Sequence, residues 1–208
     1  MTVVAWDFDG VLNHSVAQGG FLWAERFEAD TGQSLAVFQD HVFARDFRAV
    51  LTGREDLRER VARWAEAVGY APGADALLAY WFERDLRLDA GILALVEGLA
   101  RRGVRQVIAT NNEPRRVAYI EREAALGPLA GRVLASGRLG AAKPDPAFFA
   151  AVTNALGVAP SAMVLVDDLA ANVEQARRLG WRAFHLADAT RPALAGALLG
   201  ALARGNPR

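Results

Sequence analysis

Hydrophobic positions along the chain follow two different periods. Short runs of apolar and β-branched residues predict strands at Thr2–Phe8, Val104–Thr110, Arg132–Ser136, Met163–Asp167 and Arg182–Leu186. Around the later runs, apolar residues recur at three- and four-residue spacing and predict helices at Gly91–Arg102, Pro114–Leu126, Pro146–Leu156 and Leu169–Leu179. Because strands and helices alternate and the strands are continuously apolar, the sequence predicts an α/β fold, a Rossmann-like open parallel sheet sandwiched by helices.

A glycine follows each of these predicted helices, at positions Gly103, Gly127, Gly157 and Gly180. The residue that ends a helix often adopts a positive φ, which glycine reaches without steric strain. The four glycines therefore predict where the helices end.

The region between the first strand and Leu88 departs from this alternation. Its amphipathic segments predict four helices, at Phe21–Ala29, Leu35–Phe47, Asp56–Val68 and Ala74–Leu86. A crossover between parallel strands needs only about a dozen residues. We therefore predict an all-helical cap domain over residues 14–88, inserted into an α/β core of residues 1–13 and 89–208. The run Thr52-Gly53-Arg54-Glu55 predicts a capping box that opens the third cap helix.

Composition excludes several classes of protein. The 208 residues carry 24 basic and 24 acidic side chains, without the basic excess typical of nucleic-acid or anionic-membrane binding. The absence of cysteine excludes disulfide scaffolds, thiolate metal sites and cysteine catalysis. No signal-peptide pattern and no apolar stretch of about 20 residues is found. We expect a cytoplasmic protein that binds neither nucleic acid nor a membrane.

Polar residues follow three of the predicted strands and precede one predicted helix. These segments are Asp7-Phe8-Asp9-Gly10-Val11, Thr110-Asn111-Asn112, Asp167-Asp168 and Lys143-Pro144-Asp145-Pro146. The carboxyl ends of parallel strands form the ligand crevice of an open sheet. Because strand side chains alternate, Asp7 and Asp9 are expected to project the same way, while Trp6 and Phe8 pack in the core.

Four carboxylates at one sheet edge would repel one another unless a cation lay among them. Oxygen ligands without histidine or cysteine favour Mg²⁺ over zinc. The basic residues include a single lysine, Lys143, and the rest are arginine. A planar, forked guanidinium cannot replace a compact ammonium held between a carboxylate and a phosphate. Together these groups predict a phosphate site in which one carboxylate attacks.

The four segments resemble the motifs of the haloacid dehalogenase-like hydrolase superfamily, over almost the whole chain. The run Val164–Val173, with Ala176 and Leu179-Gly180, is similar to the subgroup that holds sugar-phosphate phosphatases and to the phosphatase domains fused to some epoxide hydrolases. Helices inserted directly after the first motif imply the type 1 helical cap of this superfamily.

The resemblance implies the catalytic residues of a Mg²⁺-dependent phosphatase that hydrolyses a small phosphorylated metabolite, such as a sugar phosphate. Asp7 would be the nucleophile that forms an aspartyl-phosphate, and its other oxygen would bind Mg²⁺. Asp9 would be the general acid and then the general base, with its backbone carbonyl on the metal. Lys143 would bridge the nucleophile and the phosphate.

The resemblance also implies binding residues around this centre. Thr110 and the Asn111 amide would bind phosphoryl oxygens, beside the backbone amides of Phe8 and Asp9. Asp168 would bind Mg²⁺ directly, and Asp167 would act through water or a neighbouring contact.

Three further residues have no settled role in this resemblance. Asn172 lies where many relatives have another acid, and His14 replaces an acid that is common just after the first motif. Arg54, near a turn of the cap, is a candidate substrate contact, with a solvated position at a helix start as the simpler alternative.

Other functions remain open at this point. A phosphomutase uses the same four motifs, and a non-hydrolytic phospho-accepting or binding module also clusters Asp, Thr and Lys on a parallel sheet. A dehalogenase typically lacks the second acid of the first motif, so Asp9 disfavours it. Residues 14–88 carry nine arginines and twelve acidic residues, which does not suit a polyanionic substrate. Cap aromatics offer surface for a homodimer, and they are Trp23, Phe38, Phe43, Phe47, Trp64 and Trp81.

Overall fold

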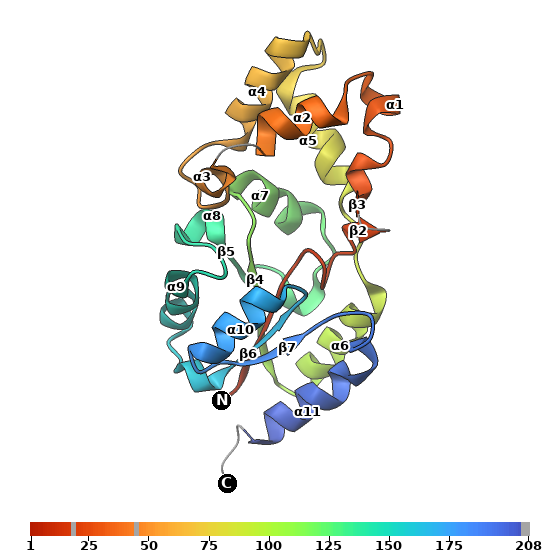
Figure 1. The fold of residues 1–208 in the computed structure, drawn as a ribbon. Coiled ribbons are helices and arrows are strands. Elements are labelled where there is room, and N and C mark those ends of the chain that lie inside the picture. The colour runs from red at the N-terminus through yellow and green to blue at the C-terminus, as the bar shows by residue number, and fades with distance from the viewer. Residues whose placement is uncertain (18–19, 44–45, 205–208) are drawn as a thin grey trace.

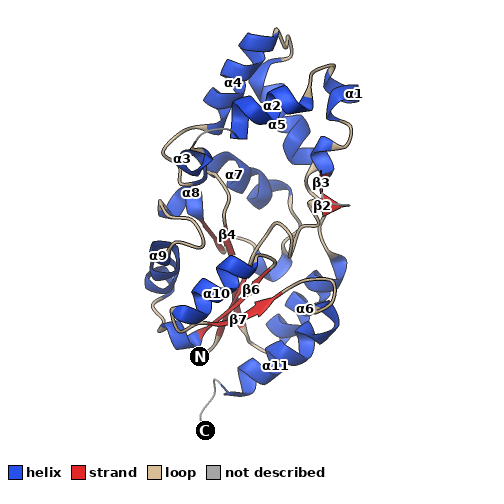
Figure 2. Ribbon diagram, viewed as in Figure 1, coloured by secondary structure: helices blue, strands red, loops and turns tan. Residues whose placement is uncertain are grey.

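A five-stranded parallel sheet lies at the centre of the computed structural model, which describes residues 1–17, 20–43 and 46–204 (Figures 1 and 2). Its strands are β1 (Val3–Trp6), β4 (Arg105–Thr110), β5 (Val133–Ala135), β6 (Met163–Asp167) and β7 (Arg182–His185). Their order is β5-β4-β1-β6-β7, so β1 pairs with both β4 and β6. All five predicted strands are confirmed. The strand order reverses at β1, and such a switch point opens a crevice at the carboxyl edge.

Helices cover both faces of the sheet, as predicted. Alternate residues of β1 pack in opposite directions, Val4 and Trp6 into one apolar cluster and Val3 and Ala5 into the other. The first cluster includes residues of α6 (Ala90–Arg101), α7 (Pro114–Glu123) and α11 (Leu194–Arg204), and the second includes residues of α9 (Pro146–Leu156) and α10 (Ala170–Arg178).

The glycines predicted to end these helices all have positive φ, with values of 72°, 51°, 65° and 84° in chain order. Helix α7 nevertheless ends at Glu123, three residues before the predicted Leu126. The backbone of Ala124 is extended there, and Leu126 turns into the core, where it is 2% exposed. Gly127 then begins a short 3₁₀ helix. Further short helices connect the core elements, and they are η2 (Gly127–Leu129), α8 (Ser136–Leu139), η3 (Pro160–Ala162) and η4 (Arg191–Ala193).

A second group of helices gathers at the end of the molecule away from both termini (Figure 1). It comprises η1 (Leu22–Ala24), α1 (Phe27–Thr31), α2 (Leu35–Phe43), α3 (Phe47–Leu51), α4 (Leu57–Val68) and α5 (Gly73–Arg84). These helices share an apolar cluster of their own, whose buried members all lie between Trp23 and Phe82. The helical character of this region was predicted, and the division of the chain at residues 14 and 88 stays a prediction.

The boundaries within this region differ from the predicted ones. A two-stranded antiparallel sheet, β2 (Val16–Ala17) with β3 (Gly20–Phe21), precedes the helices. Strands of two residues are too short to produce a visible period in the sequence. The helix predicted at Phe21–Ala29 is replaced by η1 and α1. The helix predicted at Leu35–Phe47 is divided into α2 and α3, and residues 44–45 of that prediction lie outside the described residues.

The predicted capping box at Thr52-Gly53-Arg54-Glu55 is wrong. Thr52 Oγ1 donates to the carbonyl oxygen of Arg48 at 2.7 Å and so belongs to the end of α3. Helix α4 begins after Asp56, whose carboxylate accepts a hydrogen bond from the Arg58 amide at 2.9 Å. Glu55 binds arginine side chains instead of the backbone, because two guanidinium groups lie within its reach.

The aromatic residues predicted to offer a dimer surface lie inside the second group of helices. Trp23, Phe38 and Trp64 are at most 2% exposed. Phe43, Phe47 and Trp81 are partly buried and pack against the same cluster. These side chains form the interior of the region, so this argument for a homodimer does not hold, and a homodimer itself stays a prediction.

None of the helices within residues 1–17, 20–43 and 46–204 combines the length and the apolar character needed to cross a membrane.

Glu55 connects α4 to the preceding chain through two arginines. Its carboxylate binds Arg60 and lies 2.5 Å from Arg63 Nη2, and Arg60 also donates to the carbonyl oxygens of Val42 and Asp46 at 3.0 Å. The hydrogen bond from Arg60, opposed by burial and supported by Arg63, lowers the pKa of Glu55 to about 2.

Glu55→Gln is expected to lower the free energy of unfolding by about 1.5–3 kcal/mol at pH 7, the range of a hydrogen bond to a charged group. Because folding lowers the pKa of Glu55, its stabilisation is complete above the ordinary value of 4.5 and is lost as the pH falls toward 2. Urea unfolding at pH 7 and pH 3 measures the difference. The matched control is Glu66→Gln, an exposed carboxylate on the same helix. Equal losses in both variants, or a loss independent of pH, would contradict this role.

Candidate active site

The four predicted motifs come together at the carboxyl edge of the sheet. Asp7 follows β1, Thr110 ends β4, Asp167 ends β6, and Lys143 lies in the loop before α9. Because β1 pairs with β4 on one side and β6 on the other, the ends of these three strands are neighbours. Residues that lie more than 100 positions apart in the sequence thereby share one site.

Lys143 lies between two of the carboxylates. Its Nζ is 2.9 Å from Asp7 Oδ2 and 2.7 Å from Asp167 Oδ2, and its side chain is fully buried. Burial alone would lower the pKa of Lys143, but the carboxylates of Asp7 and Asp167 outweigh it and raise this pKa. The lysine therefore stays charged, which is the state that the predicted bridging role needs.

Negative charge exceeds positive charge in this cluster. Burial raises the pKa of Asp7 well above its ordinary value, with Lys143 opposing the rise and Asp167 and Asp168 adding to it. Burial and the neighbouring Asp167 likewise raise the pKa of Asp168. A further cation among these carboxylates would relieve the repulsion that a single ammonium leaves.

The residues fit a cation that prefers oxygen ligands. Asp7, Asp167 and Asp168 each offer a carboxylate oxygen, and these oxygens lie within 4.8 Å of one another. Gly10 has a φ of 81°, and a Cβ at this position would lie 2.3 Å from Asp168 Oδ2. Only glycine allows the turn after β1 to approach Asp168 so closely. The donor set, carboxylate oxygen alone, is the kind that Mg²⁺ and Ca²⁺ bind.

Asp167 is fixed from several directions. Its Oδ1 accepts hydrogen bonds from the Leu169 amide and from Asn172 Nδ2, both at 2.9 Å, while Lys143 binds Oδ2. The structure thus gives Asn172 a clear contact, because its side-chain amide orients a buried carboxylate. An acid at position 172 would instead bring a like charge against Asp167.

Asn111 fixes the backbone of Lys143. Its side chain accepts a hydrogen bond from the Lys143 amide and donates one to the Lys143 carbonyl oxygen, both at 2.8 Å. The following peptide bond, Lys143–Pro144, is cis. Both polar atoms of the side chain are thus engaged in holding the backbone of Lys143, and the backbone amide of Asn111 stays the predicted anion-binding group.

Two other predicted phosphate-binding groups lie around the same centre. The Phe8 amide donates to Asp7 Oδ1 at 2.7 Å, while the Phe8 side chain is buried in the core as predicted. Thr110 Oγ1 accepts a hydrogen bond from Asn112 Nδ2 at 2.8 Å. A hydroxyl that accepts this bond keeps its own proton to donate to a ligand.

The carboxylate of Asp9 lines the same cavity as Asp7 and Asp168, but it is not among the three carboxylates whose oxygens lie within 4.8 Å of one another. Its Oδ1 accepts a hydrogen bond from Asn13 at 2.8 Å, and its Oδ2 accepts one from Asn112 at 3.0 Å. Arg116 Nη2 lies 3.7 Å from Oδ1. These three donors hold the Asp9 carboxylate in the turn that follows β1.

Asn13, Arg116 and Asp85 are the site residues that the sequence reasoning missed. Arg116 donates to Asp85 Oδ2 at 3.1 Å, and both side chains are buried. Burial raises the pKa of Asp85 to about 7, with Arg116 opposing the rise and Asp9 adding to it. The spacing of Arg116 and Asp85 in the sequence could have indicated them. Arg116 lies four residues before Ile120, and Asp85 lies three residues after Phe82. Each charge thus interrupts the apolar stripe of its helix pattern.

A cavity of about 350 Å³ lies between these polar groups and the second group of helices. Asp7, Asp9, Thr110, Asn111 and Asp168 contribute to one wall. The opposite wall is mainly aromatic and aliphatic, formed by Phe21, Trp23, Phe43, Phe47, Leu51, Leu57, Trp81 and Phe82. The arrangement can hold a small ligand with one charged end and one apolar end.

His14 and Arg54 do not line this cavity. His14 is half-exposed, and its Nδ1 lies 3.6 Å from Asp89 Oδ2. Arg54 Nε donates to Thr52 Oγ1 at 3.1 Å, and its guanidinium lies 3.8 Å from Asp46. Both positions fit the simpler alternative of a residue at the molecular surface.

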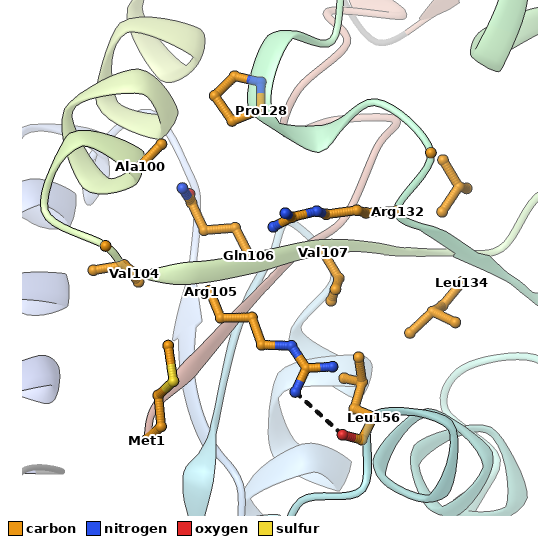
Figure 3. A pocket seen from close by; sticks show the side chains of 13 residues that line it. Met1, Ala100, Val104, Arg105, Gln106, Val107, Pro128, Arg132, Leu134 and Leu156 are labelled. Carbon is orange, nitrogen blue, oxygen red and sulfur yellow. Dashed lines mark hydrogen bonds between the residues drawn. The ribbon is translucent and has the colours of Figure 1, made fainter.

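A larger cavity, of about 730 Å³, lies at the opposite edge of the sheet (Figure 3). It surrounds the start of β4, where Arg105 donates to the carbonyl oxygen of Leu156 at 3.2 Å (Figure 3). None of the four motifs contributes to its walls. The greater volume of this cavity therefore does not make it the candidate active site. The buried charged residues at the carboxyl edge of the sheet do.

Comparisons with known proteins agree with the motifs. A family model of haloacid dehalogenase-like hydrolases matches residues 1–180. A protein of Mycobacterium tuberculosis named as a phosphatase is 41% identical over 90 residues, which are 43% of this chain and 42% of the relative. A phosphoserine phosphatase of Thermus thermophilus is 37% identical over 144 residues, which are 65% of this chain and 56% of the relative. The chain thus spans about half the length of these curated relatives.

Solved structures agree with the fold. A haloacid dehalogenase family enzyme of Bacteroides thetaiotaomicron, determined in complex with magnesium and inorganic phosphate, superposes with a TM-score of 0.73. The match covers 90% of this chain and 94% of that one, at 20% sequence identity. The sheet and its flanking helices therefore belong to a known architecture.

Lys143→Met is expected to lower the free energy of unfolding by about 3–5 kcal/mol at pH 8, because it leaves buried Asp7 and Asp167 without their counter-charge. At pH 5 the loss should be smaller, since a buried carboxylate of raised pKa can take up a proton there. Urea unfolding in the presence of a chelator measures both values.

The double variant Lys143→Met with Asp167→Asn serves as the control for this experiment. It removes one of the unpaired charges and should regain part of the lost stability. A loss below about 1 kcal/mol in the single variant, as for an exposed ion pair, would show that the contact is not a buried one.

Proposed function

The chain belongs to the haloacid dehalogenase-like hydrolases, and from this premise we propose that it is a Mg²⁺-dependent phosphatase of a small phosphorylated metabolite, such as a sugar phosphate. The observation that carries the proposal is Lys143, fully buried between Asp7 and Asp167 beside a third carboxylate, Asp168. Two curated relatives named as phosphatases support it, as does a structural neighbour determined with magnesium and inorganic phosphate.

Asp7 is the proposed nucleophile. One of its carboxylate oxygens attacks phosphorus, the bond from phosphorus to the ester oxygen breaks, and an aspartyl-phosphate forms. Asp9 gives its proton to the departing alcohol oxygen. Asn13 and Asn112 hold the Asp9 carboxylate for this transfer, and Lys143 lowers the repulsion between Asp7 and the phosphoryl group.

The second step returns the enzyme to its starting state. Asp9, now a carboxylate, takes a proton from water, and the water oxygen attacks phosphorus. The bond from phosphorus to Asp7 breaks, which releases inorganic phosphate and restores the Asp7 carboxylate. The Thr110 hydroxyl and the backbone amides of Phe8, Asp9 and Asn111 are the proposed donors to the phosphoryl oxygens.

Asp7, Asp168 and the backbone carbonyl of Asp9 are the proposed Mg²⁺ ligands, with Asp167 acting through water or a neighbouring contact. When bound, the ion supplies positive charge that stabilises the phosphoryl oxygens. Residues 14–88 are the proposed cap, which excludes bulk water from the cavity and contacts the leaving group.

Asp7→Asn should abolish phosphate release while the protein stays folded, because the amide has the size of the carboxylate but is a far weaker nucleophile. We expect a loss of at least about a thousandfold in kcat. A panel of phosphate monoesters, with Mg²⁺ and colorimetric detection of inorganic phosphate, measures it, and circular dichroism checks the fold. Asp40→Asn, an exposed acid of α2, is the matched control.

Wild-type protein that releases no phosphate from any ester of this panel would overturn the phosphatase proposal. Formation of an isomeric phosphate in place of inorganic phosphate would identify a phosphomutase instead.

Mg²⁺ should raise the melting temperature of the wild-type protein, and Asp168→Asn should remove most of this rise. A ligand that binds only the folded state stabilises it by about 2.7 kcal/mol at 100 times its Kd, which corresponds to several degrees. Without Mg²⁺ the variant should be at least as stable as the wild type, since one of the clustered negative charges is gone. Differential scanning fluorimetry measures both effects. Equal Mg²⁺-dependent rises in the two proteins would contradict the assignment of Asp168.

A further inference from the structure

Two residues that line the cavity each have a buried polar atom without a partner among the described residues. Asp85 Oδ1 and Ser15 Oγ have no hydrogen-bond partner among the described residues. Asp85 is 7% exposed and Ser15 is 1% exposed, and both line the cavity that also contains Asp7 and Asp9. A buried polar atom without a partner is unfavourable, so a ligand group that binds it is favoured.

Asp85 lies close to the proposed general acid. Arg116 Nη2 donates to Asp85 Oδ2 at 3.1 Å and lies 3.7 Å from Asp9 Oδ1, so the two carboxylates share one guanidinium nitrogen. Asp9 is proposed to protonate the ester oxygen of the substrate. Asp85 therefore lies near the first carbons of the leaving group, beyond that oxygen.

The rest of this wall is built from packed aromatic rings. The ring of Trp81 lies 5.0 Å from that of Trp23, 5.4 Å from that of Phe43 and 5.8 Å from that of Phe82, measured between centroids. Phe47 continues the wall at 4.9 Å from Phe43. Packed rings present a broad apolar surface to a ligand, and such surfaces bind aliphatic or aromatic groups.

Charge on this wall disfavours an acidic leaving group. Glu113, 4% exposed, also lines the cavity, and its carboxylate accepts from the backbone amides that begin α7. Arg116 is already bound to Asp85 and to the Phe82 carbonyl oxygen at 2.9 Å. A carboxylate on the leaving group would meet the acidic side chains of Asp85 and Glu113, whereas a hydroxyl or an ammonium would find an acceptor.

From these observations, and resting on the proposed phosphatase function, we infer that this part of the cavity binds the leaving group. Ser15 and Asp85 are specificity-determining residues for phosphate monoesters of apolar alcohols that carry a hydrogen-bond donor next to the ester-bearing carbon. The donor, a hydroxyl or an ammonium, binds Asp85 Oδ1 and Ser15 Oγ, while the apolar body packs against Trp81 and Phe43.

Three esters that differ at one position test this inference. The first, 2-phenylethyl phosphate, carries no donor. At the same carbon, 2-hydroxy-2-phenylethyl phosphate carries a hydroxyl and 2-amino-2-phenylethyl phosphate carries an ammonium. Phosphate release by the wild-type protein should give a kcat/KM at least about tenfold higher for a donor-bearing ester than for the donor-free ester, mainly through KM. The two donor-bearing esters distinguish hydroxyl from ammonium.

Asp85→Ala and Ser15→Ala should each reduce this preference, because each deletes one of the free polar atoms. We expect the tenfold preference to fall to about threefold or less, measured within each variant as the ratio of kcat/KM for the donor-bearing ester to kcat/KM for the donor-free ester. Arg87 is exposed and lies two residues after Asp85, so Arg87→Ala is the matched control and should keep the preference. Ser15→Ala removes a single oxygen and keeps the test valid if Asp85→Ala fails to fold.

The outcomes separate this inference from the function on which it rests. If wild-type protein hydrolyses all three esters equally, the subsite is refuted while the phosphatase function stands. A parallel loss on all three esters in both variants would assign Ser15 and Asp85 a structural contribution only and would overturn the inference. If wild-type protein hydrolyses none of the three esters but releases phosphate from other esters of the panel, the inference is overturned and the phosphatase function stands. If it releases phosphate from no ester of the panel, both fail.

Discussion

The buried ion pairs of Lys143 are the constraint on which the rest of the site depends. An ammonium without exposure to water is stable only if carboxylates surround it, and Asp7 and Asp167 lie within 2.9 Å. Those two acids come from β1 and β6, so the pairing of the strands and the pairing of the charges require the same arrangement. Asn111 then fixes the backbone that carries the lysine. The single lysine of the chain is thus held by three separate segments.

Sheet topology explains how distant segments reach this lysine. Strand β1 lies between β4 and β6, and the carboxyl ends of all three strands open on one side. Two helical layers bury the faces of the sheet, so its carboxyl edge is where polar side chains can gather. The excess of carboxylates at that edge is compatible with folding because Lys143 neutralises part of it and because Asn172 and the Leu169 amide stabilise Asp167.

The sequence was sufficient to predict features that depend on local period or on strand order. It predicted five strands, both helical layers and the meeting of Asp7, Lys143, Asp167 and Asp168 at one edge. It was insufficient where several side chains compete for one partner. Glu55 illustrates this, because Arg60 and Arg63 occupy the carboxylate that a capping box would aim at the backbone. The aromatic residues of the second group of helices illustrate another limit, since a helical pattern does not say which apolar face lies inside a small bundle and which lines a cavity.

The residues that the sequence did not predict connect the proposed general acid to the chain that follows α5. Asn13 Nδ2 donates to Asp9 Oδ1 at 2.8 Å and to the Asp85 carbonyl oxygen at 2.7 Å, and Asn13 Oδ1 accepts from the Arg87 amide. Arg116 likewise contacts both Asp9 and Asp85. The donors that orient the acid are therefore the same groups that hold the chain where it returns from residues 14–88 to the core. The second group of helices has its own apolar interior, yet Asp9 is still placed accurately. The same side chains, Asn13 and Arg116, contact Asp9 and the chain at Asp85, where it leaves these helices.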